Sequence, residues 1–364
     1  MDQLIYQIAL SLAHGVGPVK SRLLLSYCGS ASEIITARPD VLNKIPEISW
    51  ATIKELKNPD LLRKAEQEAL FVANNNVSPL FFTDPHYPER LKHCADAPIL
   101  IFTRGHINFN NSHVVSIVGT RAATSYGKAF CEQLVQALVP HSPLIVSGLA
   151  YGIDVCAHRA SLKSGLSTVA CLAHGLDRVY PALHSTVARE MLSSGGLVTE
   201  FVSGTRPDRE LFPMRNRIIA GLADCTVVVE TDERGGSMIT AHLAHGYGRD
   251  VFALPGRHSD THSKGCNQLI RRHVAAILTN PNDLAEYMNW QTGGATITSQ
   301  TRLFEGLDPD EEEVVALLRA SALGLDQIAI QTGRPVSQIS SLLLNLEFRG
   351  VIHAAPGKVF HLEK

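Results

Sequence analysis

Short apolar runs, each followed by a glycine-containing turn, recur through the middle of the chain. Four of them are Val114–Val118, Pro143–Val146, Cys225–Val229 and Val251–Leu254. They are bounded by glycine or proline and precede segments with helical periodicity, a pattern typical of buried parallel strands. We therefore expect an α/β domain built on a parallel sheet. Ligands of such sheets lie outside the carboxyl ends of the strands, so we expect the site on the loops that follow these runs.

The segment before the first run predicts further strands and a helical N-terminal domain. Leu80–Thr83 and Ile99–Thr103 have the composition of two more strands that extend the sheet. Residues 1 to 72 contain short helical patterns, and the turn Gly15-Val-Gly17 resembles that of a helix-hairpin-helix, whose amides can grip a phosphate. A plain helical bundle is favoured over a phosphate-binding turn, because residues 1 to 113 carry 11 basic and 11 acidic side chains.

The C-terminal part predicts a linker and a small separate domain. Residues 291 to 302 are rich in Thr, Gly, Ser and Gln without apolar periodicity, as in a linker. Residues 303 to 364 contain three helical patterns and a terminal hairpin, which together suggest a winged helix. The helices are expected from Asp308, over Leu325–Thr332 and over Val336–Arg349. The third carries only Arg349 as a cation, so a structural or protein-contact role is favoured over a place in a DNA groove.

Composition and charge narrow the class of protein. The 364 residues suffice for two or three domains, of which residues 73 to 290 are the largest, and 45% hydrophobic content supports a packed core. The sequence has no apolar run of membrane-spanning length and no good signal peptide, and its seven cysteines include no C-x-x-C pair. A reducing cytoplasm therefore fits best. Net charge is −2, but residues 114 to 280 carry 16 basic against 13 acidic side chains. The middle of the chain could therefore face an anion.

The first two loops are candidates for phosphate contact. Gly119, Thr120 and Arg121 follow a strand, and Ser125 is the expected N-cap of the next helix, which would leave amides facing outward beside the guanidinium. Ser147, Gly148 and Gly152 form a second strand-to-helix turn with room for close backbone approach. A dinucleotide fingerprint needs G-x-G-x-x-G, and only Gly119 fits it. NAD and FAD are therefore excluded, and no cofactor is expected.

The next two loops add cations and amides. Arg215, Asn216 and Arg217 are expected in the first turn of a helix behind Pro213, where cations oppose the helix dipole and a bound anion would explain them. The alternative is a pair of structural salt bridges to Asp208, Glu210 or Glu230. Gly235 and Gly236 can expose amides while Ser237 caps the following helix.

The remaining candidates are weaker. Lys264 in a glycine turn, with Asn267, could follow a phosphodiester chain, although such side chains are commonly just solvated. Asp154 and His158 could be an acid-base dyad, but a hydrogen bond within the helix is favoured because no nucleophile lies at suitable spacing. No metal is expected, because a third ligand at metal-site spacing is missing for four further histidines, His242, His245, His258 and His262.

Taken together, these segments resemble the DNA-processing protein A family (DprA, also called Smf). The matching motifs span most of the chain, and the block Arg215-Asn-Arg-Ile-Ile-Ala-Gly221 is the most specific of them. Other matches are Gly119-Thr-Arg121, Ser147-Gly148 with Gly152-Ile-Asp154, Gly236-Ser237, Gly248 to Gly256 and Gly265-Cys-Asn267. The resemblance implies a sterile-alpha-motif-like N-terminal domain, an extended Rossmann domain and a winged-helix tail.

The resemblance also implies a function. The family consists of recombination mediators of bacterial natural transformation, which protect incoming single-stranded DNA, dimerise through the Rossmann domain and help to load the RecA recombinase. It implies a non-enzymatic binder whose phosphate contacts carry over to Gly119, Arg121, Ser147, Gly148, Arg215, Asn216, Gly236 and Ser237. One alternative is a phosphoribohydrolase of the lysine-decarboxylase-like (LOG) type, which shares the sheet but needs a P-G-G-x-G-T-x-x-E loop. Another is an adaptor that acts through its acidic tail.

Overall fold

The computed structural model describes residues 2–290, 307–320, 323–349, 351–355 and 359–362. The chain divides into two compact units, Met1–Thr292 and Gly293–Lys364, and each is described by itself. The predicted linker, residues 291 to 302, lies outside the described residues.

The N-terminal region is helical, as the sequence predicts. Its helices are α1 (Asp2–Leu12), α2 (Pro18–Cys28), α3 (Ala31–Thr36), α4 (Pro39–Leu42), α5 (Trp50–Leu56) and α6 (Pro59–Asn74). Ser30 caps α3 by accepting a hydrogen bond from the Glu33 amide at 3.2 Å. The longest helix, α6, was not predicted individually; it packs its buried Leu61, Ala65 and Val72 into one cluster with α1.

The larger unit contains, among its described residues, a nine-stranded sheet of order β1-β2-β6-β5-β4-β3-β7-β8-β9. The strands are β1 (Ser78–Phe81), β2 (Leu100–Gly105), β3 (Val114–Val118), β4 (Leu144–Ser147), β5 (Thr168–Cys171), β6 (Gly195–Thr199), β7 (Cys225–Val228), β8 (Asp250–Ala253) and β9 (Ala276–Ile277). The pairs from β6 to β9 are parallel, and β2 joins both β1 and β6 antiparallel. The six strands expected from apolar runs are confirmed, whereas β5, β6 and β9 were not predicted.

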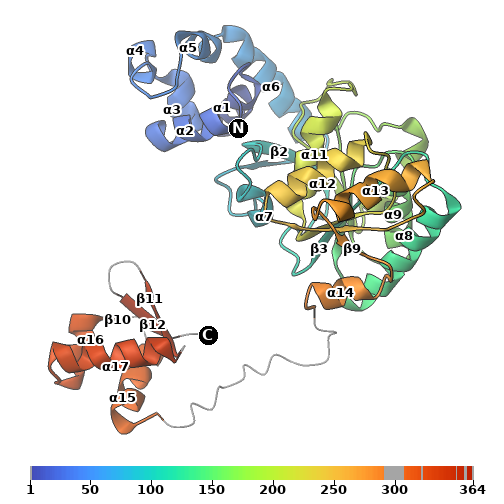
Figure 1. Cartoon of the computed structure of the whole chain (residues 1–364). Coiled ribbons are helices and arrows are strands. Elements are labelled where there is room, and N and C mark those ends of the chain that lie inside the picture. Colours follow the sequence, from blue (N-terminus) through green and yellow to red (C-terminus); the bar gives the residue numbers. More distant parts are fainter. Residues whose placement is uncertain (1, 291–306, 321–322, 350, 356–358, 363–364) are drawn as a thin grey trace. The chain divides into compact units, whose positions relative to one another are not determined.

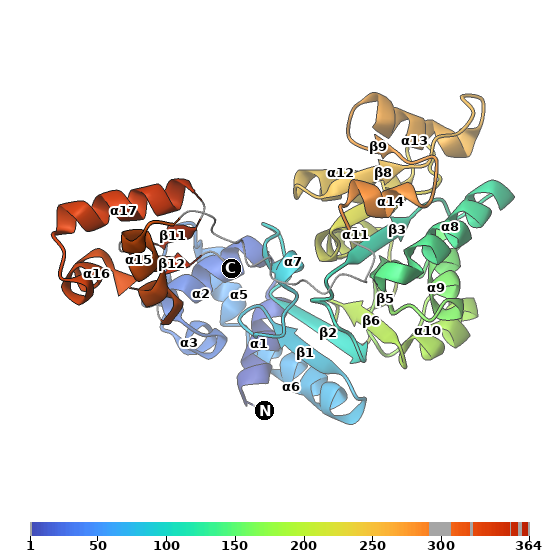
Figure 2. The same ribbon diagram turned by 90° about the horizontal axis from the view of Figure 1, so that it is seen from below.

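Helices cover both faces of this sheet (Figures 1 and 2). On one face Val114 and Val118 of β3 pack with α7 (Glu89–Lys92), α11 (Leu211–Leu222), α12 (Gly236–Gly246) and α13 (Thr261–Arg271). On the other face Val115 and Ile117 pack with α8 (Ser125–Leu138), α9 (Ile153–Lys163) and α14 (Asp283–Tyr287), while α10 (Ser185–Met191) joins the cluster of the N-terminal helices. Because side chains on both faces of a central strand are buried, the runs are largely apolar, and the Ser116 hydroxyl in β3 is paired with that of Thr226 in β7.

The strand order reverses at β3. Strands β4, β5 and β6 follow on one side of β3, and the chain then returns to place β7 on its other side. The helix after β3 and the helix after β7 therefore lie on opposite faces of the sheet. This divergence opens a crevice at the carboxyl ends of β3 and β7, where sheets of this type bind ligands.

The smaller unit has the predicted three helices and hairpin. They are α15 (Pro309–Ala320), α16 (Leu325–Thr332), α17 (Val336–Phe348), β11 (Ile352–Ala355) and β12 (Val359–Leu362), with a short unpredicted strand β10 (Leu323–Gly324). The sheet order β10-β12-β11 is antiparallel and completes a winged helix. Arg349, the cation of the third helical segment, contacts the Glu311 carboxylate at 2.7 Å. That ion pair joins the end of α17 to α15 within the unit.

Candidate nucleic-acid interface

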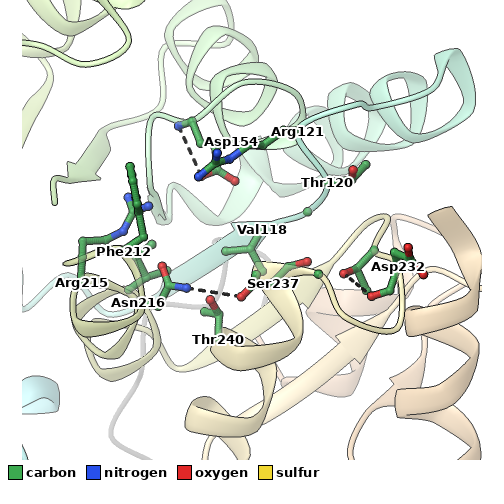
Figure 3. Close-up of a pocket in the computed structure, with 16 residues that line it drawn as sticks. Val118, Thr120, Arg121, Asp154, Phe212, Arg215, Asn216, Asp232, Ser237 and Thr240 are labelled. Carbon is green, nitrogen blue, oxygen red and sulfur yellow. Dashed lines mark hydrogen bonds between the residues drawn. The ribbon is translucent and has the colours of Figure 1, made fainter. Parts of the chain in front are cut away.

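A cavity of about 310 Å³ lies where the sheet order reverses (Figure 3). It is bounded by the loop after β3, the loop after β4, the first turns of α11 and the loop from β7 into α12. Eight of the predicted site residues line it, namely Gly119, Thr120, Arg121, Arg215, Asn216, Gly235, Gly236 and Ser237. Three separate sequence motifs therefore meet in one place, as the positions of the strand ends led us to expect.

The loop after β3 supplies an exposed cation. A Cβ atom on Gly119 would lie 2.5 Å from the Ile153 side chain, so only glycine allows this close passage over α9. Arg121 is exposed, and its guanidinium carbon lies 5.1 Å from the centre of the Phe212 ring. A cation held over an aromatic face keeps its remaining donors directed outward, where an anion can reach them.

The start of α8 differs from the prediction. Thr124, not Ser125, is the N-cap and accepts a hydrogen bond from the Gly127 amide at 3.2 Å. The Glu230 carboxylate accepts hydrogen bonds from the Thr124 amide at 2.9 Å and from its hydroxyl at 2.5 Å. The expectation of open amides facing a ligand here is therefore wrong, because the protein's own carboxylate occupies the positive end of α8.

The loop after β4 is tightly packed and bounds one side of the cavity. Gly152 has φ +77°, and a Cβ atom there would lie 2.1 Å from the Thr120 carbonyl oxygen. Asp154 is buried and accepts a hydrogen bond from the Ala150 amide at 3.4 Å. Ser147 does not reach the cavity, because it is fully buried and donates its hydroxyl to the Ile117 carbonyl at 2.6 Å. Gly148 and Gly152 thus shape the site, and Ser147 joins two strands beneath it.

Arg215 forms the back of the cavity. Only 4% of it is exposed, and its Nη1 donates to the carbonyl oxygens of Gly148 and Cys171, each at 2.6 Å. Its Nε is buried without a hydrogen-bond partner. Burial lowers the pKa of the guanidinium, and the charge of the nearby Asp154 opposes that shift. A buried cation with an unused donor at the back of a cavity favours an anionic ligand.

Arg217 points away from the site. It is buried and forms an ion pair with Glu200 while donating to the Asp96 carbonyl oxygen. The anion-binding interpretation is therefore wrong for Arg217, and the salt-bridge alternative holds with a different carboxylate from those considered. The helix also begins at Leu211, so Pro213 lies inside its first turn and both arginines lie beyond it.

The start of α12 is open to the cavity. Gly235 is the N-cap and provides no side-chain cap, so the amides of Gly236 and Ser237 lack the partners that a helix interior supplies, while the Met238 amide donates to the Gly235 carbonyl at 3.1 Å. A Cβ atom on Gly236 would meet nothing within 4 Å. Ser237 does not cap the helix; it is 7% exposed, and its hydroxyl has no hydrogen-bond partner. Asn216 donates to the Gly236 carbonyl at 3.3 Å and braces this turn from α11.

Lys264 and Asn267 lie elsewhere. Both belong to α13, so Lys264 is on a helix and not in a glycine turn. Asn267 exchanges two hydrogen bonds with the backbone of Gly256, at 3.2 and 2.9 Å. Lys264 and Asn267 line a separate hollow of about 140 Å³ together with Arg271 and Glu233. The structure therefore does not bring them into the cavity.

Asp154 and His158 have different partners. The Thr168 hydroxyl donates to the Ile145 carbonyl and lies 2.7 Å from His158 Nδ1, so it accepts from that ring nitrogen. The hydrogen bond predicted between Asp154 and His158 is replaced by these contacts.

Within the described part of the chain, no group of three or more His, Cys, Asp or Glu side chains could hold a metal ion. No helix of the described residues is long and apolar enough to cross a membrane.

Comparison with known proteins decides the family. A model of the family described as DNA recombination-mediator protein A matches residues 78–289, and a DprA winged helix domain matches residues 299–358. The chain belongs to the DNA recombination-mediator protein A family. It is 30% identical to the protein Smf of Synechocystis over 97% of both chains, and 33% identical to the protein Smf of Escherichia coli over 76% of this chain and 75% of that protein.

Two solved structures of the family are similar to this one. The crystal structure of DNA processing protein A from Streptococcus pneumoniae matches with a TM-score of 0.63 and 31% identity, over 78% of this chain and 97% of that chain. DNA processing protein A from Helicobacter pylori matches with a TM-score of 0.53 and 27% identity, over 58% of this chain and 95% of that chain. The latter structure concerns the single-stranded DNA binding mode of that protein.

Several residues of the cavity were not predicted. Phe212, Thr231, Asp232 and Thr240 line it, and Phe212 also lies 5.8 Å from the Arg215 guanidinium carbon. Phe212 lies three residues before the Arg215–Gly221 block, so its place one turn before Asn216 on the helix was the available signal. Asp232 and Thr240 carried no signal, because a strand-end carboxylate and a helical threonine are common in any α/β domain.

Proposed function

We propose that this protein binds single-stranded DNA in the cavity at the carboxyl ends of β3 and β7, with a backbone phosphate on the first turn of α12. The observation that carries the proposal is the Ser237 hydroxyl, which is buried at an open helix start without a partner. Helix starts with free amides favour phosphate oxygens, and the hydroxyl adds one more donor. Arg121 and Arg215 lie across the same cavity and supply positive charge.

The bases are proposed to stack on aromatic side chains beside the cavity. Tyr180 is 45% exposed, and its ring centre lies 6.3 Å from that of Phe212. Tyr151 is 44% exposed and packs edge-on against His184 at 5.1 Å. Stacking on such rings tolerates any base but requires unpaired ones, so it favours single strands without reading their sequence. Little sequence preference is therefore expected.

The finer roles rest on family membership. We propose that the protein acts as a recombination mediator that protects the incoming strand and helps to load RecA, without catalysing a reaction. A homodimer through the Rossmann domain is also proposed, and the exposed Ile277 on the edge strand β9 is compatible with such a contact. The separate hollow at Lys264 and Asn267 is proposed as a weaker, secondary contact for a longer strand.

Fluorescence anisotropy with labelled oligo-dT at two ionic strengths tests the central proposal. We expect tight binding at low salt, a preference for single over double strands, and a logarithmic salt slope of about −0.7 per phosphate contact. A matched duplex of the same length is the control for charge alone. Equal affinity for the duplex, or an affinity that salt does not change, would contradict the proposal.

The mediator role needs a second measurement. Strand exchange by RecA on DNA coated with single-strand binding protein should be faster when this protein is added. A variant lacking residues 303 to 364 separates the proposed roles of the two units. Binding that survives this deletion places the DNA contact in the larger unit, whereas loss of binding would favour a tail-dependent adaptor.

A further inference from the structure

Two cysteines meet between the helices that lead away from the site. Cys131 lies on α8 and Cys156 on α9, and both side chains belong to the cluster in which these two helices pack together. Cys131 is fully buried in the cluster that covers this face of the sheet, and Cys156 packs against the same cluster while half-buried. The Cys156 thiol also donates to the Lys128 carbonyl at 3.7 Å, one turn before Cys131 on α8.

These contacts bring both side chains to the same turn of α8. A helical side chain leans toward the preceding turn, so Cys131 lies over the segment that includes Lys128. Cys156 reaches the same segment from the neighbouring helix. We propose that Cys131 and Cys156 form a reversible disulfide, with Cys156 as the thiol that a peroxide oxidises first. The proposal is independent of DNA binding, because neither cysteine lines the cavity.

The surroundings assign the two roles. The neighbouring Cys131 thiol lowers the pKa of the Cys156 thiol; burial and Glu132 oppose this, while the charges of Lys128 and Arg159 add to it. The neighbouring Cys156 thiol and burial raise the pKa of Cys131. A thiolate is the nucleophile in thiol oxidation, and Cys156 is also the one of the pair that solvent reaches. Cys131 is therefore the resolving thiol.

The reaction balances with hydrogen peroxide as the oxidant. The Cys156 thiolate attacks one peroxide oxygen, the O–O bond breaks, and hydroxide leaves to take up the proton released from Cys156, giving water and a sulfenic acid. Cys131 sulfur then attacks the Cys156 sulfur, the S–O bond breaks, and the departing hydroxide takes the Cys131 proton as a second water. Two thiols lose two electrons in total, and one peroxide gains them.

The other cysteines provide the comparison. Cys94, Cys171, Cys225 and Cys266 are buried, and burial raises the pKa of each. Cys28 is half-buried like Cys156, but burial and Glu33 raise the pKa of its thiol. Cys28 is thus the matched control, because solvent reaches its thiol as it reaches Cys156, but its pKa is raised and not lowered.

Peroxide oxidation of the whole reduced chain tests the proposal. One equivalent of hydrogen peroxide should lower the number of thiols that react in denaturant from seven to about five, and dithiothreitol should restore seven. Peptide mapping should find Cys131 joined to Cys156. Seven remaining thiols, or a disulfide between any other pair, would overturn the proposal.

Variants separate the two roles. Cys156→Ser should abolish the loss of thiols, and Cys28→Ser should leave it as in the parent chain. Cys131→Ala should stop the reaction at a Cys156 sulfenic acid that dimedone traps. If Cys131→Ala does not fold, dimedone added with peroxide to the parent chain still reports which sulfur is oxidised first. Labelling of Cys28 before Cys156 would contradict the assignment.

Discussion

Arg215 is held directly behind Gly148. Its Nη1 donates to the Gly148 carbonyl oxygen at 2.6 Å, and a Cβ atom on Gly148 would lie 2.1 Å from that same nitrogen. The buried guanidinium is therefore positioned by the absence of a side chain on the neighbouring loop. The two motifs, 67 residues apart in the sequence, form one unit of structure.

Gly148→Ala should therefore damage both folding and binding. The added methyl must displace the guanidinium from its buried carbonyl contacts, so we expect a loss of about 1 to 3 kcal/mol in the free energy of unfolding and weaker oligo-dT binding. Urea unfolding and anisotropy measure the two effects. Gly246→Ala is the control: its Cβ atom would meet nothing within 4 Å, so stability should be unchanged or slightly higher.

Arg121→Ala should weaken binding and spare the fold. The side chain is exposed and faces the cavity, so its loss removes a charge-assisted contact of about 1 to 3 kcal/mol without leaving a buried group unpaired. The dissociation constant for oligo-dT should rise about 5- to 150-fold. Arg189→Ala removes an exposed cation on α10 that does not line the cavity, and it should leave affinity nearly unchanged. Equal effects of the two variants would mean that only net charge matters.

Ser237→Ala should separate binding from stability. Its hydroxyl is buried without a partner, so removal should leave the free energy of unfolding unchanged or raise it. Binding should weaken by about 0.5 to 1.5 kcal/mol if the hydroxyl donates to a phosphate. Ser116→Ala is the opposite case, because the Ser116 hydroxyl donates to that of Thr226 at 2.7 Å within the sheet. It should lower stability and leave affinity unaltered.

Arg217→Met should destabilise the protein by about 3 to 5 kcal/mol, because it leaves the Glu200 carboxylate buried without its ion-pair partner. One oxygen of that carboxylate, Oε1, already lacks a hydrogen bond. The double variant with Glu200→Leu should recover most of the loss, since both charges are then absent. Chemical denaturation of the four species of this cycle checks the prediction; a double variant no better than Arg217→Met would contradict it.

Stability should decline in acid through His158. Burial, with the charges of His184 and Arg215, lowers the pKa of this histidine from 6.5 to about 3. Between these values the unfolded chain binds the extra proton, so the stabilisation is complete above pH 6.5 and is lost as the pH falls toward 3. The free energy of unfolding should fall by up to about 1.4 kcal/mol per pH unit. His158→Asn should flatten this slope in urea titrations, whereas the exposed His245→Asn should retain it.

The sequence predicted the central strands well because their apolar character comes from burial on both faces. It missed β6, which begins with two glycines that lower strand propensity. The structure explains them: Gly195 has φ +149°, and a Cβ atom there would lie 2.0 Å from the Thr168 carbonyl oxygen. A close approach between two strands cannot be inferred from either strand alone.

The site was predicted in outline, and the errors have physical causes. Arg215 and Arg217 are two positions apart, so a helix directs them about 200° apart, and only one of the two can face the cavity. Which one does so depends on where Glu200 lies, 17 residues earlier and on another segment. In the same way, the capping of α8 by a carboxylate 106 residues later has no local sequence signature.

Glu230 therefore acts as a resident anion. Several helices begin at the same edge of the sheet. At the start of α8 the Glu230 carboxylate already provides a negative charge, whereas the start of α12 is open to the cavity. The position of a bound polynucleotide would then be set by the open start of α12, which takes a phosphate, and not by any base. Replacing Glu230 by a neutral side chain would free the start of α8 as a second phosphate-binding position, without adding any positively charged residue.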